Sequence, residues 1–228
     1  RLVGEVPPSA ALLSVANRRI QVSAVAVKPG VAIDTVLPKG WQQPAYPYSY
    51  AIRAGDTLFL SGLVPRDPGT GEPITGNIET QTKAVLDAAG AILEAGGLSF
   101  GNVVSSRVFL SNVSDFQAMN ATYRPYFGDT PPARATVRAT LTNPAFLVEV
   151  TLTAAAGGPR IVYTTPGEDG APGQVNPHLS SAIGLGRRLF LSGMLGVTPG
   201  ATRDAVAQTN ETLSRLERTM ALAGIGWP

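Results

Sequence analysis

The chain has no cysteine, and its only histidine is His178. The absence of cysteine excludes disulfides, thiolate catalysis and cysteine-ligated zinc. A Ser-His-Asp triad would need His178 as its base, and the turn-like Asn-Pro-His-Leu context of this residue favours an ordinary surface position. Charge is also scarce, because 15% of the residues are charged and the formal net charge is +2. Without a run of Lys or Arg, we expect neither nucleic acid nor an anionic membrane as the partner.

Long apolar runs are lacking as well. None reaches the roughly 18 residues that a membrane span requires. The N-terminus does not have the basic-then-apolar layout of a signal peptide, so the cytoplasm is the expected location. Hydrophobic residues nevertheless make up 44% of the 228 residues. This composition predicts a sizeable core in one large or two ordinary domains.

Two alternating runs of polar and apolar residues, at 131–141 and 146–152, predict strands with one packed and one wet face. Arg134 shares a face with Thr136 and Arg138, and Glu149 points away from the apolar face of the second strand. On neighbouring strands, the guanidinium would suit a carboxylate ligand and the carboxylate would suit a water proton. On pattern alone, two solvated charges or a cross-strand Arg-Glu pair are the more common arrangement.

An internal repeat organises the chain. Residues 47–62 recur as residues 178–193, and each copy reads as a hairpin that turns at a glycine and ends in Phe-Leu-Ser-Gly. An amphipathic helix follows in both copies. The first copy then continues with a strand at 103–110 and a helix at about 114–126. The stripes predicted to be buried are Ile78, Thr82, Val85, Ala89 and Ile92 in one helix, and Val206, Thr209, Leu213, Leu216 and Met220 in the other.

The repeat predicts three parts. Residues 1–36 match the C-terminal part of a degenerate unit, residues 37–159 form a complete unit, and residues 160–228 match the N-terminal part of a degenerate unit. Together the two outer parts lack a counterpart of about 102–124, which is one strand and one helix. A circular permutant that lost this piece, a segment of a longer tandem array and a removed segment all fit. We favour a missing or removed segment, because an open sheet without that strand exposes unpaired edges.

Several short motifs follow one another within about a hundred residues. They are Pro-Tyr-Ser-x-Ala, Phe-Leu-Ser-Gly, Gln-Thr, Asp-Phe-x-x-x-Asn-x-x-Tyr, Pro-x-Arg-x-x-Val and Val-Glu-Val. In this order and spacing, residues 40–156 closely resemble the reactive intermediate deaminase family, also called Rid or YjgF. The two outer parts resemble it more faintly. The most specific feature is Pro-x-Arg, ending at Arg134, with Glu149 downstream.

The resemblance implies an α+β fold of the chorismate-mutase-like (YjgF) type, a mixed β-sheet with two helices packed on one face, present here as two tandem units. It also implies a homo-oligomer, a trimer or pseudo-trimer, with ligand clefts between units. Members of the family hydrolyse 2-imino or enamine acids to 2-oxo acids and ammonia, using neither metal nor organic cofactor. The implied partner is therefore a small 2-imino or 2-oxo acid.

By position, the resemblance implies that Arg134 clamps the substrate carboxylate, Glu149 orients water and passes protons, and Tyr48 closes the cleft. The further implied site residues are Ser61 and Gly62 at the imine end, Asn120 as cleft support, and Thr136 where many members have Cys. A threonine hydroxyl still donates and accepts hydrogen bonds.

The split unit lacks these groups, since the counterparts of Arg134, Glu149 and Tyr48 are Ala10, Gln21 and Leu179. We expect it to serve packing, which leaves one active unit per chain. The alternative is a non-catalytic small-carboxylate-binding or scaffold module of the same fold. A ribonuclease or translation-inhibitor role is less favoured, because the charge is weak and no histidine pair exists.

Overall fold

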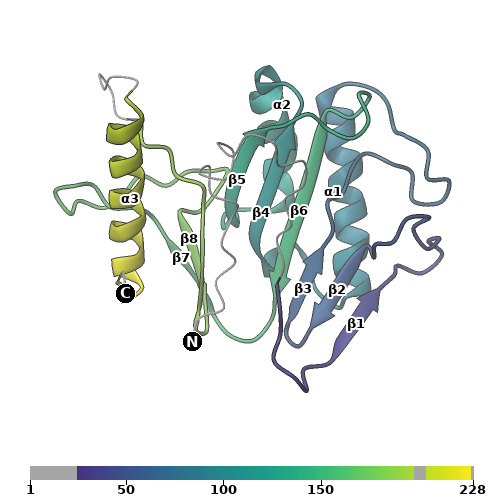
Figure 1. Cartoon of the computed structure of the whole chain (residues 1–228), viewed down its shortest axis with the longest axis horizontal. Coiled ribbons are helices and arrows are strands. Elements are labelled where there is room, and N and C mark those ends of the chain that lie inside the picture. The colour runs from purple at the N-terminus through teal and green to yellow at the C-terminus, as the bar shows by residue number, and fades with distance from the viewer. Residues whose placement is uncertain (1–24, 198–203, 227–228) are drawn as a thin grey trace, which may run out of the picture.

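The computed structural model describes residues 25–197 and 204–226, so Ala10 and Gln21 lie outside the described residues. A six-stranded sheet has the order β1-β2-β3-β6-β4-β5, in which only β4 and β5 are parallel (Figure 1). Its strands are β1 (Ile33–Val36), β2 (Ala51–Ala54), β3 (Thr57–Leu60), β4 (Val103–Leu110), β5 (Ala133–Arg138) and β6 (Val148–Ala155). The predicted strand at 103–110 is confirmed. Strand β1 belongs to this sheet although it precedes residue 37, where the repeat placed the start of the complete unit.

Two helices cover one face of this sheet, α1 (Ile78–Ala95) and α2 (Phe116–Tyr123) (Figure 1). Short 3₁₀ helices lie at Phe100–Asn102, Val113–Asp115 and Arg124–Tyr126. The side chain of Asn77 caps α1 by accepting a hydrogen bond from the Thr80 amide. The stripe predicted on α1 is buried throughout. It packs on the alternate apolar residues of β4 and β6, which gives the α+β YjgF architecture.

The Gln-Thr motif explains how β6 enters the sheet. Gln81 on α1 is 1% exposed. Its Nε2 donates to the Ala145 carbonyl at 2.8 Å and its Oε1 accepts from the Leu147 amide at 2.7 Å. One buried side chain therefore fixes the loop that leads into β6, and with it the position of Glu149.

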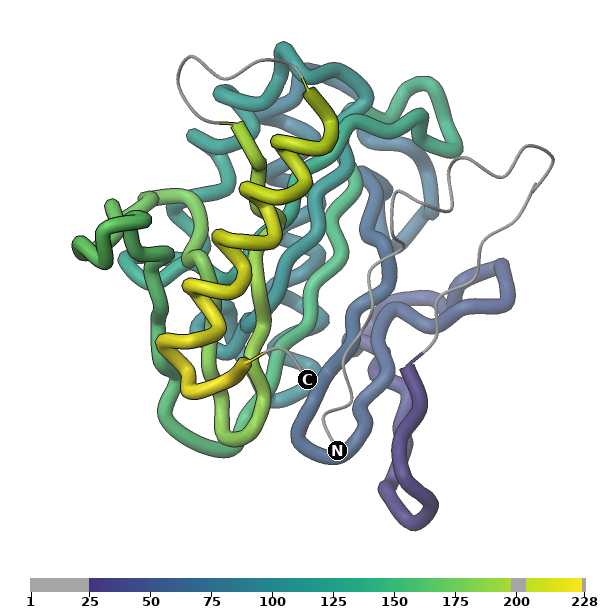
Figure 2. Tube along the Cα trace, turned by 60° about the vertical axis from the view of Figure 1, so that its left-hand side comes forward, coloured from purple at the N-terminus to yellow at the C-terminus, as the bar shows by residue number. Residues whose placement is uncertain are grey.

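The C-terminal part forms a second, antiparallel sheet of β7 (Arg160–Tyr163), β8 (Ala182–Leu185) and β9 (Arg188–Leu191). The two predicted hairpins are confirmed, since Gly55 and Gly186 turn the chain with φ of 60° and 57°. The second sheet lies beside β4 and β5 (Figure 2). Their contact is apolar and includes Ile183, Leu185, Val104, Ala133 and Ala155.

Helix α3 (Ala205–Leu222) lies on the far side of β7–β9 (Figures 1 and 2). Its predicted apolar stripe is not buried as expected, because Val206 is 68% and Leu213 is 46% exposed. Within the described ranges, only Thr219 and Met220 of this helix are buried. The sheet beneath α3 has three strands in the described residues, and it offers no counterpart of β4 and β6 for the stripe to pack on.

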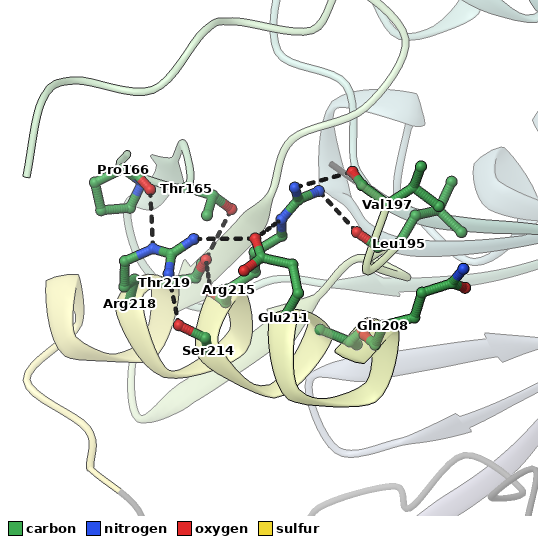
Figure 3. Close-up of polar contacts among 11 residues, drawn as sticks. Thr165, Pro166, Leu195, Val197, Gln208, Glu211, Ser214, Arg215, Arg218 and Thr219 are labelled. Carbon is green, nitrogen blue, oxygen red and sulfur yellow. Dashed lines mark hydrogen bonds and ion pairs between the residues drawn. The ribbon is translucent and has the colours of Figure 1, made fainter. Parts of the chain in front are cut away.

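Polar contacts hold α3 instead (Figure 3). Arg218 Nε donates to the Pro166 carbonyl at 3.2 Å, and Arg215 Nη1 donates to the Leu195 carbonyl at 2.7 Å. Glu211 pairs with both arginines, and the hydrogen bond from Arg215 is the main reason that its pKa lies below the usual value. These contacts attach the helix to the flanking loops rather than to an apolar core.

Candidate carboxylate-binding site

Arg134 on β5 is 2% exposed and projects toward α2. Its Nη2 donates to Asn120 Oδ1 at 2.7 Å, and its guanidinium carbon lies 4.8 Å from the centroid of the Tyr123 ring. Nε and Nη1 are buried and have no hydrogen-bond partner among the described residues. Burial lowers the pKa of Arg134, and the neighbouring Tyr123 opposes that shift. A buried cation with two unused donor nitrogens is a favourable place for a small anion.

Uncharged polar groups lie next to Arg134, beginning with the Asn120 amide. Thr136 follows on the same face of β5, and its buried Oγ1 also has no partner in the described part of the chain. Burial raises the pKa of Tyr123 to about 12, so its phenol stays protonated at neutral pH. Arg134, Asn120 and Thr136 are called the Arg134 half-site below.

A second group of predicted residues lies on the opposite face. A Cβ atom at Gly62 would overlap with Glu149 Oε1, so the carboxylate lies directly over Gly62. Burial raises the pKa of Glu149. Ser61 is tied to the chain around Tyr48 by a 2.5 Å bond from its Oγ to the Ser49 carbonyl. Tyr48 is 46% exposed. Tyr48, Ser61, Gly62 and Glu149 are called the Glu149 half-site.

The two half-sites do not meet within one unit. Strand β4 separates β5 from β6, so the prediction that Arg134 and Glu149 come from neighbouring strands is wrong. Arg134 is in register with Ser106, which faces the helices, whereas Glu149 is in register with Phe109 on the other face. The error arose because the loop at 139–147 carries the chain across β4. One ligand can contact both groups only where two units meet.

The C-terminal part lies against the Arg134 half-site, which sequence reasoning did not predict. The Ser180 amide donates to the Pro132 carbonyl at 3.1 Å. Arg134 N donates to Ser192 Oγ at 2.7 Å, and Gly193 N donates to the Arg134 carbonyl at 3.1 Å. Ser192 and Gly193 are the repeat counterparts of Ser61 and Gly62. The repeat was the one sequence signal related to this contact. It identified a second Ser-Gly turn but did not show where that turn docks.

Within residues 25–197 and 204–226, no three His, Asp or Glu side chains cluster so as to hold a metal ion. None of the helices in these ranges is long and apolar enough to cross a membrane.

The family model described as Endoribonuclease L-PSP matches residues 41–156. A RutC family protein of Pyrococcus horikoshii is 40% identical over 117 residues, which are 51% of this chain and 93% of that protein. The human 2-iminobutanoate/2-iminopropanoate deaminase is 38% identical over 89 residues, which are 39% of this chain and 65% of that protein. The chain belongs to the Endoribonuclease L-PSP family, which is the Rid or YjgF family that its motifs indicated.

Solved structures agree with this assignment. A member of the conserved Rid protein family from Yersinia pestis is 32% identical with a TM-score of 0.52, and the match covers 55% of this chain and all of that one. Escherichia coli TdcF, solved with bound serine, is 26% identical with a TM-score of 0.51 over 54% of this chain and 99% of its own. Each match covers slightly more than half of this chain, which is about the length of the part that contains the six-stranded sheet and its two helices.

Proposed function

We propose that this protein hydrolyses small 2-imino (enamine) acids to 2-oxo acids and ammonia, with Arg134 binding the substrate carboxylate. The observation that carries the proposal is the buried guanidinium, whose Nε and Nη1 have no partner among the described residues. Two comparisons support it. A human relative is named as an imino-acid deaminase, and TdcF was solved with serine, a small amino acid that carries a carboxylate.

Glu149 and Tyr48 have roles in the reaction itself. Glu149 accepts a proton from water as the water oxygen attacks the C=N carbon, and passes that proton to the imine nitrogen, which gives a carbinolamine. The hydroxyl proton is then transferred to the same nitrogen, the C–N bond breaks, and ammonia leaves as the 2-oxo acid forms. The raised pKa of Glu149 suits a group that both accepts and returns a proton. Tyr48 shields the reacting carbon from bulk water.

The required rate enhancement is modest because imines hydrolyse readily in water. A charged hydrogen bond to the carboxylate contributes about 1.5–3 kcal/mol. A positioned acid-base group contributes roughly 10² to 10⁴ in rate. No covalent nucleophile is needed, which suits a chain without cysteine.

Since the two half-sites lie on opposite faces of one sheet, the complete site requires Arg134 from one unit and Glu149 from another. We therefore propose an oligomer, a trimer or pseudo-trimer, with clefts between units.

The test generates an imine in situ with an amino-acid oxidase and follows 2-oxo acid release. Arg134→Ala and Glu149→Gln should each abolish the acceleration. Arg138→Ala, on the exposed end of the same strand, should leave it unchanged. Mixing the two inactive variants should restore part of the activity, because each supplies the half-site that the other lacks. Wild-type protein that accelerates release from no amino acid would refute the proposal.

The second candidate is a non-catalytic carboxylate-binding module. It is favoured by the docking of the C-terminal hairpin on β5, because this hairpin has Leu179 at the repeat position of Tyr48 and brings no carboxylate to Arg134. In that case Arg134→Ala abolishes binding of 2-oxobutanoate, whereas Glu149→Gln changes nothing measurable.

A further inference from the structure

Strand β9 lacks a neighbour that its repeat counterpart β3 has. In the first sheet, β3 pairs with β2 on one side and with β6 on the other. Among the strands of the described residues, β9 pairs with β8 alone and lies at the edge of its sheet. The second side of β9 is therefore an open strand edge, which proteins normally pair or cover.

The apolar side chains along this edge are less buried than their counterparts in the complete unit. Leu58 and Leu60 on β3 are 0% and 3% exposed, whereas Leu189 and Leu191 on β9 are only partly buried. The stripe of α1 is buried against β3 and β6, and the stripe of α3 is largely exposed. Both differences are explained by one missing element, a counterpart of β6 beside β9 and under α3.

The repeat identifies this counterpart as residues 20–27, which align with residues 148–155 of β6. Alternate residues of β6 face the helices and are fully buried. These residues are Val148, Val150, Leu152 and Ala154. The residues at the matching positions of the N-terminal segment are also apolar, namely Ile20, Val22, Ala24 and Ala26. The segment thus has the alternation that a strand under α3 requires.

The end of this segment lies within reach of β9 in the same chain. Arg188, the first residue of β9, donates to both carboxylate oxygens of Asp56 at 3.1 and 2.7 Å. The adjacent Gly55 amide donates to the Ala32 carbonyl at 3.3 Å. Four residues separate Ala32 from the segment 20–27. These four residues can span about 14 Å, so the segment can start along β9 without a second chain.

The part of this segment that the structure describes is unpaired. Val25 and Val27 belong to no strand, and their side chains are 42% and 37% exposed. Residues 20–24 lie outside the described residues. The segment and the edge of β9 therefore both expose apolar side chains at positions that the complete unit buries or pairs.

We propose that residues 20–27 pair with β9 of the same chain as an antiparallel strand and cover the apolar stripe of α3. The split unit is then completed by the two ends of one chain. The register follows from that of β3 and β6, in which Phe59 lies opposite Thr153. The repeat converts this pair into Phe190 opposite Val25. The pairing does not depend on the deaminase activity proposed above.

Cross-linking tests the register, because the chain has no cysteine and two introduced cysteines define a single disulfide. One double variant joins Val25→Cys to Phe190→Cys, and a second joins Ala26→Cys to Leu189→Cys. Neighbouring pairs of an antiparallel ladder alternate between a wide and a narrow spacing, and the narrow one suits a disulfide. At least one double variant should oxidise in most molecules to a cross-linked monomer, measured by intact mass and non-reducing electrophoresis. Ser23→Cys with Phe190→Cys is the control and should form little disulfide, because diagonal neighbours lie about 7–8 Å apart.

Hydrogen exchange of the full chain, followed by mass spectrometry, tests the contact with α3. Val22→Asp puts a charge on the face that lies under α3, so peptides from β9 and α3 should exchange at least about tenfold faster than in the wild-type protein. Ser23→Asp puts the same charge on the opposite face and should leave their exchange unchanged. Peptides from α1 should exchange alike in both variants, because α1 packs on the first sheet.

Three results would overturn the proposal. If neither double variant cross-links, or if the control cross-links equally well, residues 20–27 do not pair with β9 in this register. If disulfide-linked dimers form in place of cross-linked monomers, a second copy of the chain occupies the edge. If Val22→Asp and Ser23→Asp show the same exchange in β9 and α3, this segment does not cover the helix.

Discussion

Replacement of Arg134 by methionine should separate stability from ligand binding. In the described structure the guanidinium makes one hydrogen bond, to Asn120, so the folded protein carries most of the cost of removing a cation from water. That cost is several kcal/mol for a buried ion. Methionine occupies a similar volume without a charge, so the substitution removes this desolvation cost. Against this, the Asn120 oxygen is left unsatisfied at about 1–3 kcal/mol, and the interaction with the Tyr123 ring is lost at about 1–2 kcal/mol.

These terms nearly cancel, so the free energy of unfolding of Arg134→Met should lie within about 1 kcal/mol of the wild-type value. Urea denaturation followed by far-UV circular dichroism measures this difference. With 2-oxobutanoate at 100 times its Kd, the wild-type protein should gain about 2.7 kcal/mol and the variant nothing. The exposed Arg138→Met serves as the control and should behave like the wild-type protein in both conditions.

Two results would refute this reasoning. A loss of more than about 3 kcal/mol without ligand, the range seen when a buried charge pair is broken, would make Arg134 a structural residue. Ligand-induced stabilisation that persists in Arg134→Met would place the carboxylate elsewhere.

Three further predictions follow from individual contacts. Burial raises the pKa of Glu149, so the folded state binds more protons than the unfolded state, and the free energy of unfolding falls as pH rises through the raised pKa. In urea titrations, Glu149→Gln should therefore be more stable than the wild-type protein at pH 7 but not at pH 4. The control Glu79→Gln should show no such gain at pH 7. Gly62→Ala should push the Glu149 carboxylate aside and lower the deaminase rate with a stability change below about 1 kcal/mol. Gly226→Ala, where a Cβ meets nothing, should not change the rate, and equal rates in both glycine variants would contradict the placement of the carboxylate. Gln81→Ala should lose about 1–3 kcal/mol of unfolding free energy in urea, because two part-buried hydrogen bonds to the loop are removed. A loss below about 0.5 kcal/mol would show that the loop does not depend on this side chain.

Sequence periodicity predicted the buried face of α1 correctly and that of α3 poorly, for one physical reason. The stripe of α1 is buried because a full sheet lies beneath it. The stripe of α3 has the same spacing, but Val206 and Leu213 remain exposed. Periodicity shows which face of a helix would be buried, and only the number of strands beneath it decides whether burial occurs.

The sequence alone determined the local elements, the repeated hairpins, the family and the residue types able to bind a small acid. Alternation even assigned Arg134 and Thr136 to one face, as observed. Only the tertiary structure decided which groups meet, because strand order and side-chain face depend on long-range pairing that local patterns do not encode. The register of β5 and β6 on β4 put Glu149 on the other face from Arg134, and docking of the C-terminal hairpin placed Ser192 and Gly193 against the backbone of Arg134.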